Sequence, residues 1–181
     1  MKTMHNIPEN LFYQIPLSKA VSKFARELKN RVSEILGDNY EDRYSVPHLS
    51  LVKDNDPRAE RSLYYVEMMA YNLFKPFDVS VKGLGYFYQW NGRYTIYLDI
   101  VHKSPIDDVL RTLAESDVNF VPHITIAKNL EYKDFQKVWN AVKDVDYSNY
   151  YLCDHLLVLK RAHNRWTEHC KIPLGGIYTG K

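Results

Sequence analysis

Hydrophobic and polar residues follow two different periods along the chain. Residues 11–17 read LFYQIPL and predict a strand. Apolar residues then recur at the spacing of a helix, at Val21, Phe24, Leu28, Val32 and Leu36. Ser18 is the predicted N-cap of this helix, and Gly37 is its predicted end. The chain therefore begins with a strand and an amphipathic helix.

The same order of elements continues and then recurs. Asn91-Gly92 stands between two strand-like runs and predicts a hairpin, because both residues tolerate positive φ. The remaining predicted elements are a motif strand over 46–53, a helix over 57–74, a strand over 77–88, a strand over 93–101, a helix over 104–115, a second motif strand over 121–128, a helix over 132–145, a strand over 150–160 and an edge strand over 166–174. Each half thus reads strand, helix, motif strand, helix, strand.

The two motif strands are nearly the same segment. Residues 46–53 read VPHLSLVK and residues 121–128 read VPHITIAK, identical at four positions and similar at the other four. Side chains two apart share one face of a strand, so each motif presents a histidine and a hydroxyl together. An ordinary duplicated strand with solvated polar groups is the alternative, although Val or Ile would serve structure better at these positions. We interpret the repeat as an internal duplication.

Other residues of the motifs have structural interpretations. Pro47 and Pro122 mark strand starts, because proline cannot donate to a sheet ladder. Lys53 and Lys128 have the wrong parity to share the face of the histidines unless a bulge intervenes, and Lys53 is interpreted as a solvated lysine.

The pattern predicts an α+β protein formed by one domain over residues 1–181. Its two pseudo-two-fold lobes span about 11–90 and 93–174, with the motif strands near the centre and the helices on the outer faces. A chain of 181 residues buries enough surface to need no metal or disulfide. We expect a monomer, because no apolar surface stripe stands out.

Composition limits the partners. A formal net charge of +2 favours a local site for RNA ends, short oligonucleotides or nucleotides over a coat for long nucleic acid. No apolar run approaches the ~20 residues of a membrane span, and the first residues lack the core of a secretory signal, so we expect a cytoplasmic protein with no membrane partner. Cys153 and Cys170 have no metal spacing and are expected to be free thiols, although a hairpin near 162–164 would bring them roughly opposite each other.

Two imidazoles and two hydroxyls side by side are the equipment for acid–base chemistry on a phosphodiester without a metal or cofactor. A histidine with a pKa near 6.5 can act in either protonation state near neutral pH. Hydrogen bonding to phosphate oxygens suits Ser50 and Thr125 better than nucleophilic attack. The other five histidines show no paired metal spacing.

These motifs resemble the two-histidine (2H) phosphoesterase superfamily, whose pattern is two H-φ-[ST]-φ strands in a duplicated fold. Residues 120–128, FVPHITIAK, are similar to the F-x-P-H-x-T-L-x-R of its bacterial RNA-ligase-like branch, with Lys128 at the arginine. Residues 157–159, Trp166 and residues 172–174 resemble its closing hairpin.

The resemblance implies a bilobal fold with two antiparallel sheets facing a central groove. It also implies metal-free cleavage or hydrolysis of a phosphate next to a ribose hydroxyl. One of His48 and His123 would be the general base and the other the general acid, while Ser50 and Thr125 would hold the phosphate.

The expected function is a phosphodiesterase acting on 2′,3′-cyclic phosphates or 2′,5′-linked oligonucleotides, with RNA ligation as the reverse reaction. The alternatives are a phosphodiesterase for cyclic-oligonucleotide immune signals, an exonuclease that trims RNA 3′ ends, and a nucleotide-binding module without turnover. The candidates for further substrate contacts are Tyr13, Phe120, Lys128 and Trp166, and the three aromatic residues have core or rim packing as the alternative.

Overall fold

The structure is a computed structural model that describes residues 10–54, 59–114, 120–162 and 165–176. Its elements are, in chain order, β1 (Leu11–Ile15), α1 (Lys19–Leu36), β2 (Leu49–Asp54), α2 (Ala59–Leu73), β3 (Phe77–Tyr88), β4 (Tyr94–Ile100), α3 (Ser104–Ala114), β5 (His123–Leu130), α4 (Tyr132–Val142), β6 (Ser148–Cys153), β7 (His155–Ala162) and β8 (Arg165–Pro173). Most predicted elements are present within a few residues of their predicted ends.

The ends of α1 are set by the predicted residues. The Ser18 hydroxyl accepts a hydrogen bond from the Val21 amide at 3.2 Å, which satisfies one of the free amides of the first turn. Gly37 follows the helix at φ 78°, a conformation that glycine adopts without a Cβ penalty. Gly92 also has φ 78°, in the turn that joins β3 to β4 as an antiparallel hairpin.

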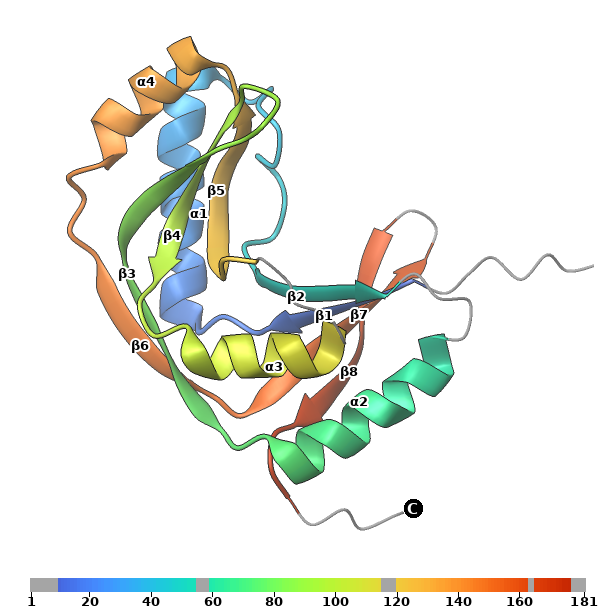
Figure 1. Ribbon diagram of the computed structural model, residues 1–181. Helices are drawn as coiled ribbons and strands as arrows, with labels where there is room; N and C mark the ends of the chain where they lie inside the picture. The colour runs from blue at the N-terminus through green and yellow to red at the C-terminus, as the bar shows by residue number, and fades with distance from the viewer. Residues whose placement is uncertain (1–9, 55–58, 115–119, 163–164, 177–181) are drawn as a thin grey trace, which may run out of the picture.

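The strands form one antiparallel sheet in the order β6-β3-β4-β5-β2-β1-β7-β8. As predicted, the two motif strands β2 and β5 lie at the centre. They are joined by one registered pair, Leu49 opposite Ile124, so the two expected sheets are halves of one continuous sheet. Figure 1 shows that β3, β4 and β5 run along α1 while β1 and β2 run across it, so the sheet turns sharply at this junction.

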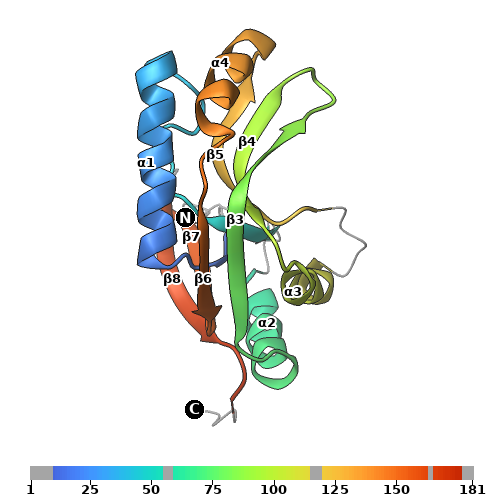
Figure 2. The ribbon, with the colours of Figure 1, turned by 90° about the vertical axis from the view of Figure 1, so that its left-hand side faces the viewer.

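The duplication appears in the order β1-α1-β2-α2 and β4-α3-β5-α4. In both repeats the first helix crosses over: α1 packs against β5, and α3 packs against β2. Figure 2 shows α4 beside the upper end of α1, and α2 and α3 in the lower part of the molecule. The half of the sheet on the β5 side contains β3 of segment 11–90 beside β4 of segment 93–174. The half on the β2 side contains β1 of segment 11–90, with β7 and β8 of segment 93–174 beyond it. Each half of the sheet therefore combines strands from both segments.

The predicted strand over 150–160 is wrong in its continuity. The chain leaves the sheet at Asp154, so that β6 pairs with β3 and β7 pairs with β1 on the far side of the sheet. Asp154 and His155 are a polar pair between two apolar runs, residues 150–153 and 156–159. An interruption of two residues does not by itself show that the chain crosses to the far side of the sheet. The crossing also separates the cysteines: β6 and β8 are the opposite edges of the sheet, and both thiols are free.

The core is one cluster formed by the inward faces of the strands and the apolar sides of the helices. Leu49 and Ile124, the residues after the two histidines, are completely buried in it. No helix in the described part of the chain is long and apolar enough to span a membrane.

Candidate active site

The two motif histidines lie at equivalent positions and make equivalent hydrogen bonds. His48 directly precedes β2, and its ring Nδ1 lies 2.7 Å from the Val46 carbonyl oxygen; His123 opens β5, and its Nδ1 lies 2.7 Å from the Val121 carbonyl oxygen. A carbonyl can only accept, so each Nδ1 is the protonated donor, and each Nε2 remains available for a substrate.

The prolines contribute to this arrangement. Pro47 is buried two residues before β2, and Pro122 is buried directly before β5, close to the strand starts that the pattern predicts. A residue that precedes proline is restricted to extended conformations, which limits the orientation of its carbonyl. Val46 and Val121 are such residues, so each Val-Pro pair presents a fixed acceptor to the following histidine.

Burial lowers the pKa of both histidines below the ordinary value of 6.5. For His48 desolvation dominates, and the bond to Val46 and the charge of Asp42 oppose it. For His123 desolvation again dominates, the bond to Val121 opposes it, and the nearby charge of His48 lowers the pKa further. Both rings are therefore mainly neutral at pH 7 in the free protein, and each can accept a proton at Nε2.

The hydroxyls share a face with the histidines. Leu49 and Ile124 are opposite each other and point into the core, so their neighbours His48, Ser50, His123 and Thr125 point to the other side. We call this side of β2 and β5 the histidine face. All four polar side chains are half-buried there.

A bulge follows the hydroxyl in each motif. In β2, Ser50 and Lys53 are three residues apart, whereas the residues opposite them on β1 are two residues apart. In β5, Thr125 and Ala127 are two residues apart, whereas the residues opposite them on β4 are adjacent in sequence. An extra residue reverses the alternation, so Lys53 and Lys128 come to the histidine face. The bulge that parity required is thus present twice.

The two lysines differ in their partners. The Lys53 ammonium lies 5.0 Å from the centre of the Phe12 ring, a cation–π distance. The Lys128 ammonium lies 3.1 Å from a carboxylate oxygen of Glu41, in the loop before β2.

Phe12 connects His48 to Trp166. Its ring centroid lies 5.5 Å from His48, edge to face, and 5.5 Å from Trp166. The structure thus places Trp166 in a contact chain that reaches His48. Tyr13 is a correction: its side chain is 2% exposed and faces the core, so it offers a substrate no surface. The signal was available, because Phe12 shares the strand parity of the polar Gln14 while Tyr13 shares that of Leu11 and Ile15.

Three aromatic rings surround His123. The ring centroid of Phe120, which precedes the motif in sequence, lies 5.6 Å from that of His123. The ring centroids of Phe87 and Tyr97 lie 5.0 and 5.4 Å from that of His123. Phe87 and Tyr97 stack on each other at 4.2 Å. Gly85 permits this arrangement, because a Cβ there would meet the Tyr97 ring at 2.6 Å. Sequence reasoning missed Phe87 and Tyr97, since their contact with His123 depends on the pairing of β3, β4 and β5.

A buried lysine holds the loop that leads to His48. Lys29 of α1 is 2% exposed, and its ammonium donates to the Asp42 carbonyl at 2.6 Å, the Asp42 carboxylate at 3.2 Å and the Ser45 hydroxyl at 2.8 Å. Asp42 has φ 77°, a strained conformation for a residue other than glycine. Burial lowers the pKa of Lys29, and the charge of Asp42 opposes this shift.

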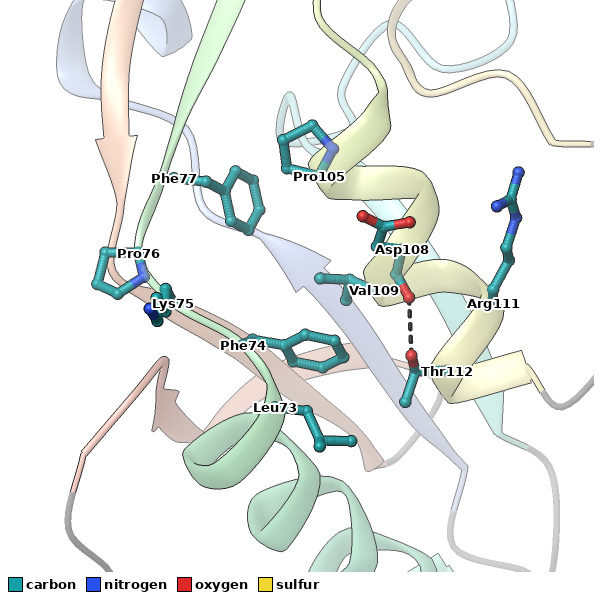
Figure 3. Close-up of a pocket in the computed structure, with 10 residues that line it drawn as sticks. All are labelled: Leu73, Phe74, Lys75, Pro76, Phe77, Pro105, Asp108, Val109, Arg111 and Thr112. Carbon is teal, nitrogen blue, oxygen red and sulfur yellow. Dashed lines mark hydrogen bonds between the residues drawn. The ribbon is translucent and has the colours of Figure 1, made fainter.

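A pocket of about 620 Å³ lies elsewhere, between the end of α2, the start of β3 and α3 (Figure 3). Phe74, Phe77 and Val109 line it together with Asp108 and Arg111, and none of the histidines that the structure describes does. It therefore lacks the acid–base pair of the histidine face. Within the described ranges, no three His, Cys, Asp or Glu side chains are grouped to hold a metal ion.

The sequence model of the 2′-5′ RNA ligase superfamily matches residues 66–165, more than half of the chain. The chain belongs to this superfamily, the 2H phosphoesterases. The matched region contains the second motif and ends before Trp166, while the first motif precedes it. A comparison with curated proteins finds no match.

Solved structures show the same fold over nearly the whole chain. TT0787 of Thermus thermophilus has 18% identity and a TM-score of 0.66, covering 93% of this chain and 100% of that one. E. coli LigT complexed with 3′-AMP has 17% identity and a TM-score of 0.61, covering 93% and 99%. Kluyveromyces marxianus Usb1 with uridine monophosphate has 10% identity and a TM-score of 0.54, also covering 93% and 99%. This 2H phosphoesterase thus shares its α+β fold with proteins solved with nucleotides.

Proposed function

We propose that this protein is a metal-independent phosphodiesterase that acts in the cytoplasm on RNA ends or short oligonucleotides, at a phosphate next to a ribose hydroxyl. The observation that carries the proposal is the matched pair of histidines, each with Nδ1 bonded to a Val-Pro carbonyl and Nε2 unused by that bond. Ser50 and Thr125 beside them provide neutral donors for the phosphate. Two solved relatives of this fold hold 3′-AMP and uridine monophosphate, which supports a nucleotide ligand.

The chemistry follows from two imidazoles in different protonation states. With a 2′,3′-cyclic phosphate, the neutral histidine removes a proton from water as its oxygen bonds to phosphorus. One of the two ring P–O bonds breaks, and the protonated histidine gives its proton to the departing ribose oxygen. With a 2′,5′ linkage, the 3′-hydroxyl replaces water as the attacking group and the 5′-oxygen departs.

Ser50 and Thr125 stabilise the charge that grows on the non-bridging oxygens in the transition state, as fixed donors do in oxyanion sites. The bound phosphate also raises the pKa of a neighbouring imidazole, because an anion favours the charged form. Substrate binding thereby supplies the protonated acid that burial disfavours in the free protein.

The test is a substrate panel in EDTA: 2′,3′-cyclic AMP, an RNA ending in a 2′,3′-cyclic phosphate, 2′,5′-linked triadenylate and its 3′,5′ isomer, with products read by mass spectrometry. His48→Asn and His123→Asn are the informative variants, because the asparagine amide keeps a donor for the Val46 or Val121 carbonyl but has no Nε2. His169→Ala, at an exposed position of β8, is the control.

We expect wild type and the control to convert at least one substrate, and each asparagine variant to lose about 10²–10⁴-fold in kcat at an unchanged melting temperature. Full activity in both asparagine variants would refute the roles of the histidines. Nucleotide binding by calorimetry without product over hours would instead support a binding module.

A further inference from the structure

Gln14, in the middle of β1, has a buried side chain that the proposed chemistry does not use. It is 5% exposed, one of three buried polar or charged side chains in the described part of the chain. The other two, Lys29 and Thr95, have hydrogen-bond partners, whereas the Gln14 amide makes no hydrogen bond to any residue within the described ranges. The amide atoms themselves are not among the fully enclosed polar atoms of the described residues, so the small exposed part of Gln14 includes its amide. A side chain that is nearly buried and keeps its polar end open to solvent is placed to bind a ligand there.

The strand register places this amide on the histidine face. Gln14 lies directly opposite Ser50, and it has the same parity as Phe12, whose ring contacts His48. Opposite side chains of an antiparallel pair have Cβ atoms about 4.5–5.5 Å apart. A glutamine amide at that distance reaches the same ligand atoms as the Ser50 hydroxyl.

The second repeat shows that structure alone does not require an amide here. Tyr97 lies opposite Thr125 on β4, just as Gln14 lies opposite Ser50 on β1. An aromatic ring stacked on Phe87 fills that equivalent place. The two sides of the histidine face therefore differ: an amide with two N–H donors lies opposite Ser50, and an aromatic ring lies opposite Thr125.

We propose that Gln14 is a substrate-binding residue whose Nε2 donates to a non-bridging oxygen of the phosphate that Ser50 holds. The proposal rests on the proposed function and adds a third neutral donor to it. A bound phosphodiester gives the amide the partner that the described residues do not provide. The donor favours binding without adding a cation that would disfavour protonation of the histidines.

The proposal gives stability and binding opposite responses to the same substitution. Gln14→Leu keeps the size of the side chain and removes the amide, so the melting temperature should stay or rise. Loss of one hydrogen bond to a charged group should weaken phosphate binding about 10- to 100-fold. Gln14→Glu, which has nearly the same shape, should bind still more weakly because its carboxylate repels the phosphate.

The experiment measures melting temperature, the Kd for inorganic phosphate by calorimetry, and KM for the substrate that wild type converts. Gln136→Leu is the matched control: the Gln136 amide donates to the Tyr132 hydroxyl at 2.8 Å on the exposed side of α4, so its loss should leave Kd and KM unchanged.

A raised Kd and KM in Gln14→Leu at an undiminished melting temperature support the assignment. A lowered melting temperature with unchanged Kd and KM would make Gln14 a structural residue and overturn the assignment alone. Wild type that neither binds phosphate nor converts any substrate would overturn the proposed function and this assignment together.

Discussion

Replacing Lys29 by methionine should destabilise the protein through the loop before His48. Methionine keeps the apolar stem of the side chain but leaves the Asp42 carbonyl, the Asp42 carboxylate and the Ser45 hydroxyl without their shared donor. Asp42 then also loses the contacts that hold its positive φ.

The magnitude follows from the burial of the pair. Removing one partner of a buried ion pair costs about 3–5 kcal/mol. The Asp42 side chain is 13% exposed and can rehydrate in part, so we expect the lower end of that range. A loss of about 3 kcal/mol in a protein of this size lowers the melting temperature by about 6–12 °C. A less ordered Val46 carbonyl should also lower kcat/KM.

The free energy of unfolding is measured by urea denaturation of Lys29→Met and of Lys23→Met as the control. Lys23 lies on the same helix, is 80% exposed and pairs with Glu27 at 3.8 Å. An exposed pair of this kind contributes little, so Lys23→Met should stay within about 0.5 kcal/mol of wild type. A change as small as this in Lys29→Met would refute the account of the loop.

Three further outcomes are expected. Burial lowers the pKa of His48 and His123, so below about pH 6.5 the unfolded chain binds more protons than the folded protein. The free energy of unfolding, measured by urea denaturation, should therefore fall from pH 7 to pH 5 more steeply in wild type than in the His48→Asn/His123→Asn double variant. Parallel curves for the two proteins would contradict this. Gly85→Ala should displace the Tyr97 ring, costing about 1–3 kcal/mol by thermal unfolding and reducing turnover; an unchanged protein would show that the ring is free to move. Burial raises the pKa of the Cys153 thiol to about 12. A thiol reagent at pH 8 should therefore leave Cys153 unmodified in the native protein and modify it in urea, as measured by mass spectrometry. Rapid modification of the native protein would contradict the burial of this thiol.

The sequence predicted the elements whose ends have local causes. Ser18 and Gly37 bound α1 because a cap and a positive φ depend on neighbouring residues only. The repeated motif likewise identified the central strands, because their polar residues have the same spacing in both copies.

Features that depend on distant pairing were not predictable in the same way. The break at Asp154 follows from which partners β6 and β7 take, and those partners lie on opposite sides of the sheet. The sequence showed that Lys53 and Lys128 reach the histidine face only if each strand contains a bulge. It did not show whether the bulges exist, because a bulge is defined by the pairing with the neighbouring strand. Tyr13 is a different case, because the parity of the polar Gln14 already assigns Tyr13 to the apolar side of β1, and the prediction did not use that signal.

The central claim, acid–base catalysis by His48 and His123, is tested most directly by the pH dependence of kcat/KM in EDTA. Wild type should give a bell with its maximum below about pH 6.5, because one histidine must be neutral, the other protonated, and burial lowers both pKa values. The residual activity of His48→Asn and of His123→Asn should lose one limb each, and different limbs, which would name the base and the acid. A bell that survives intact in either variant would contradict the claim.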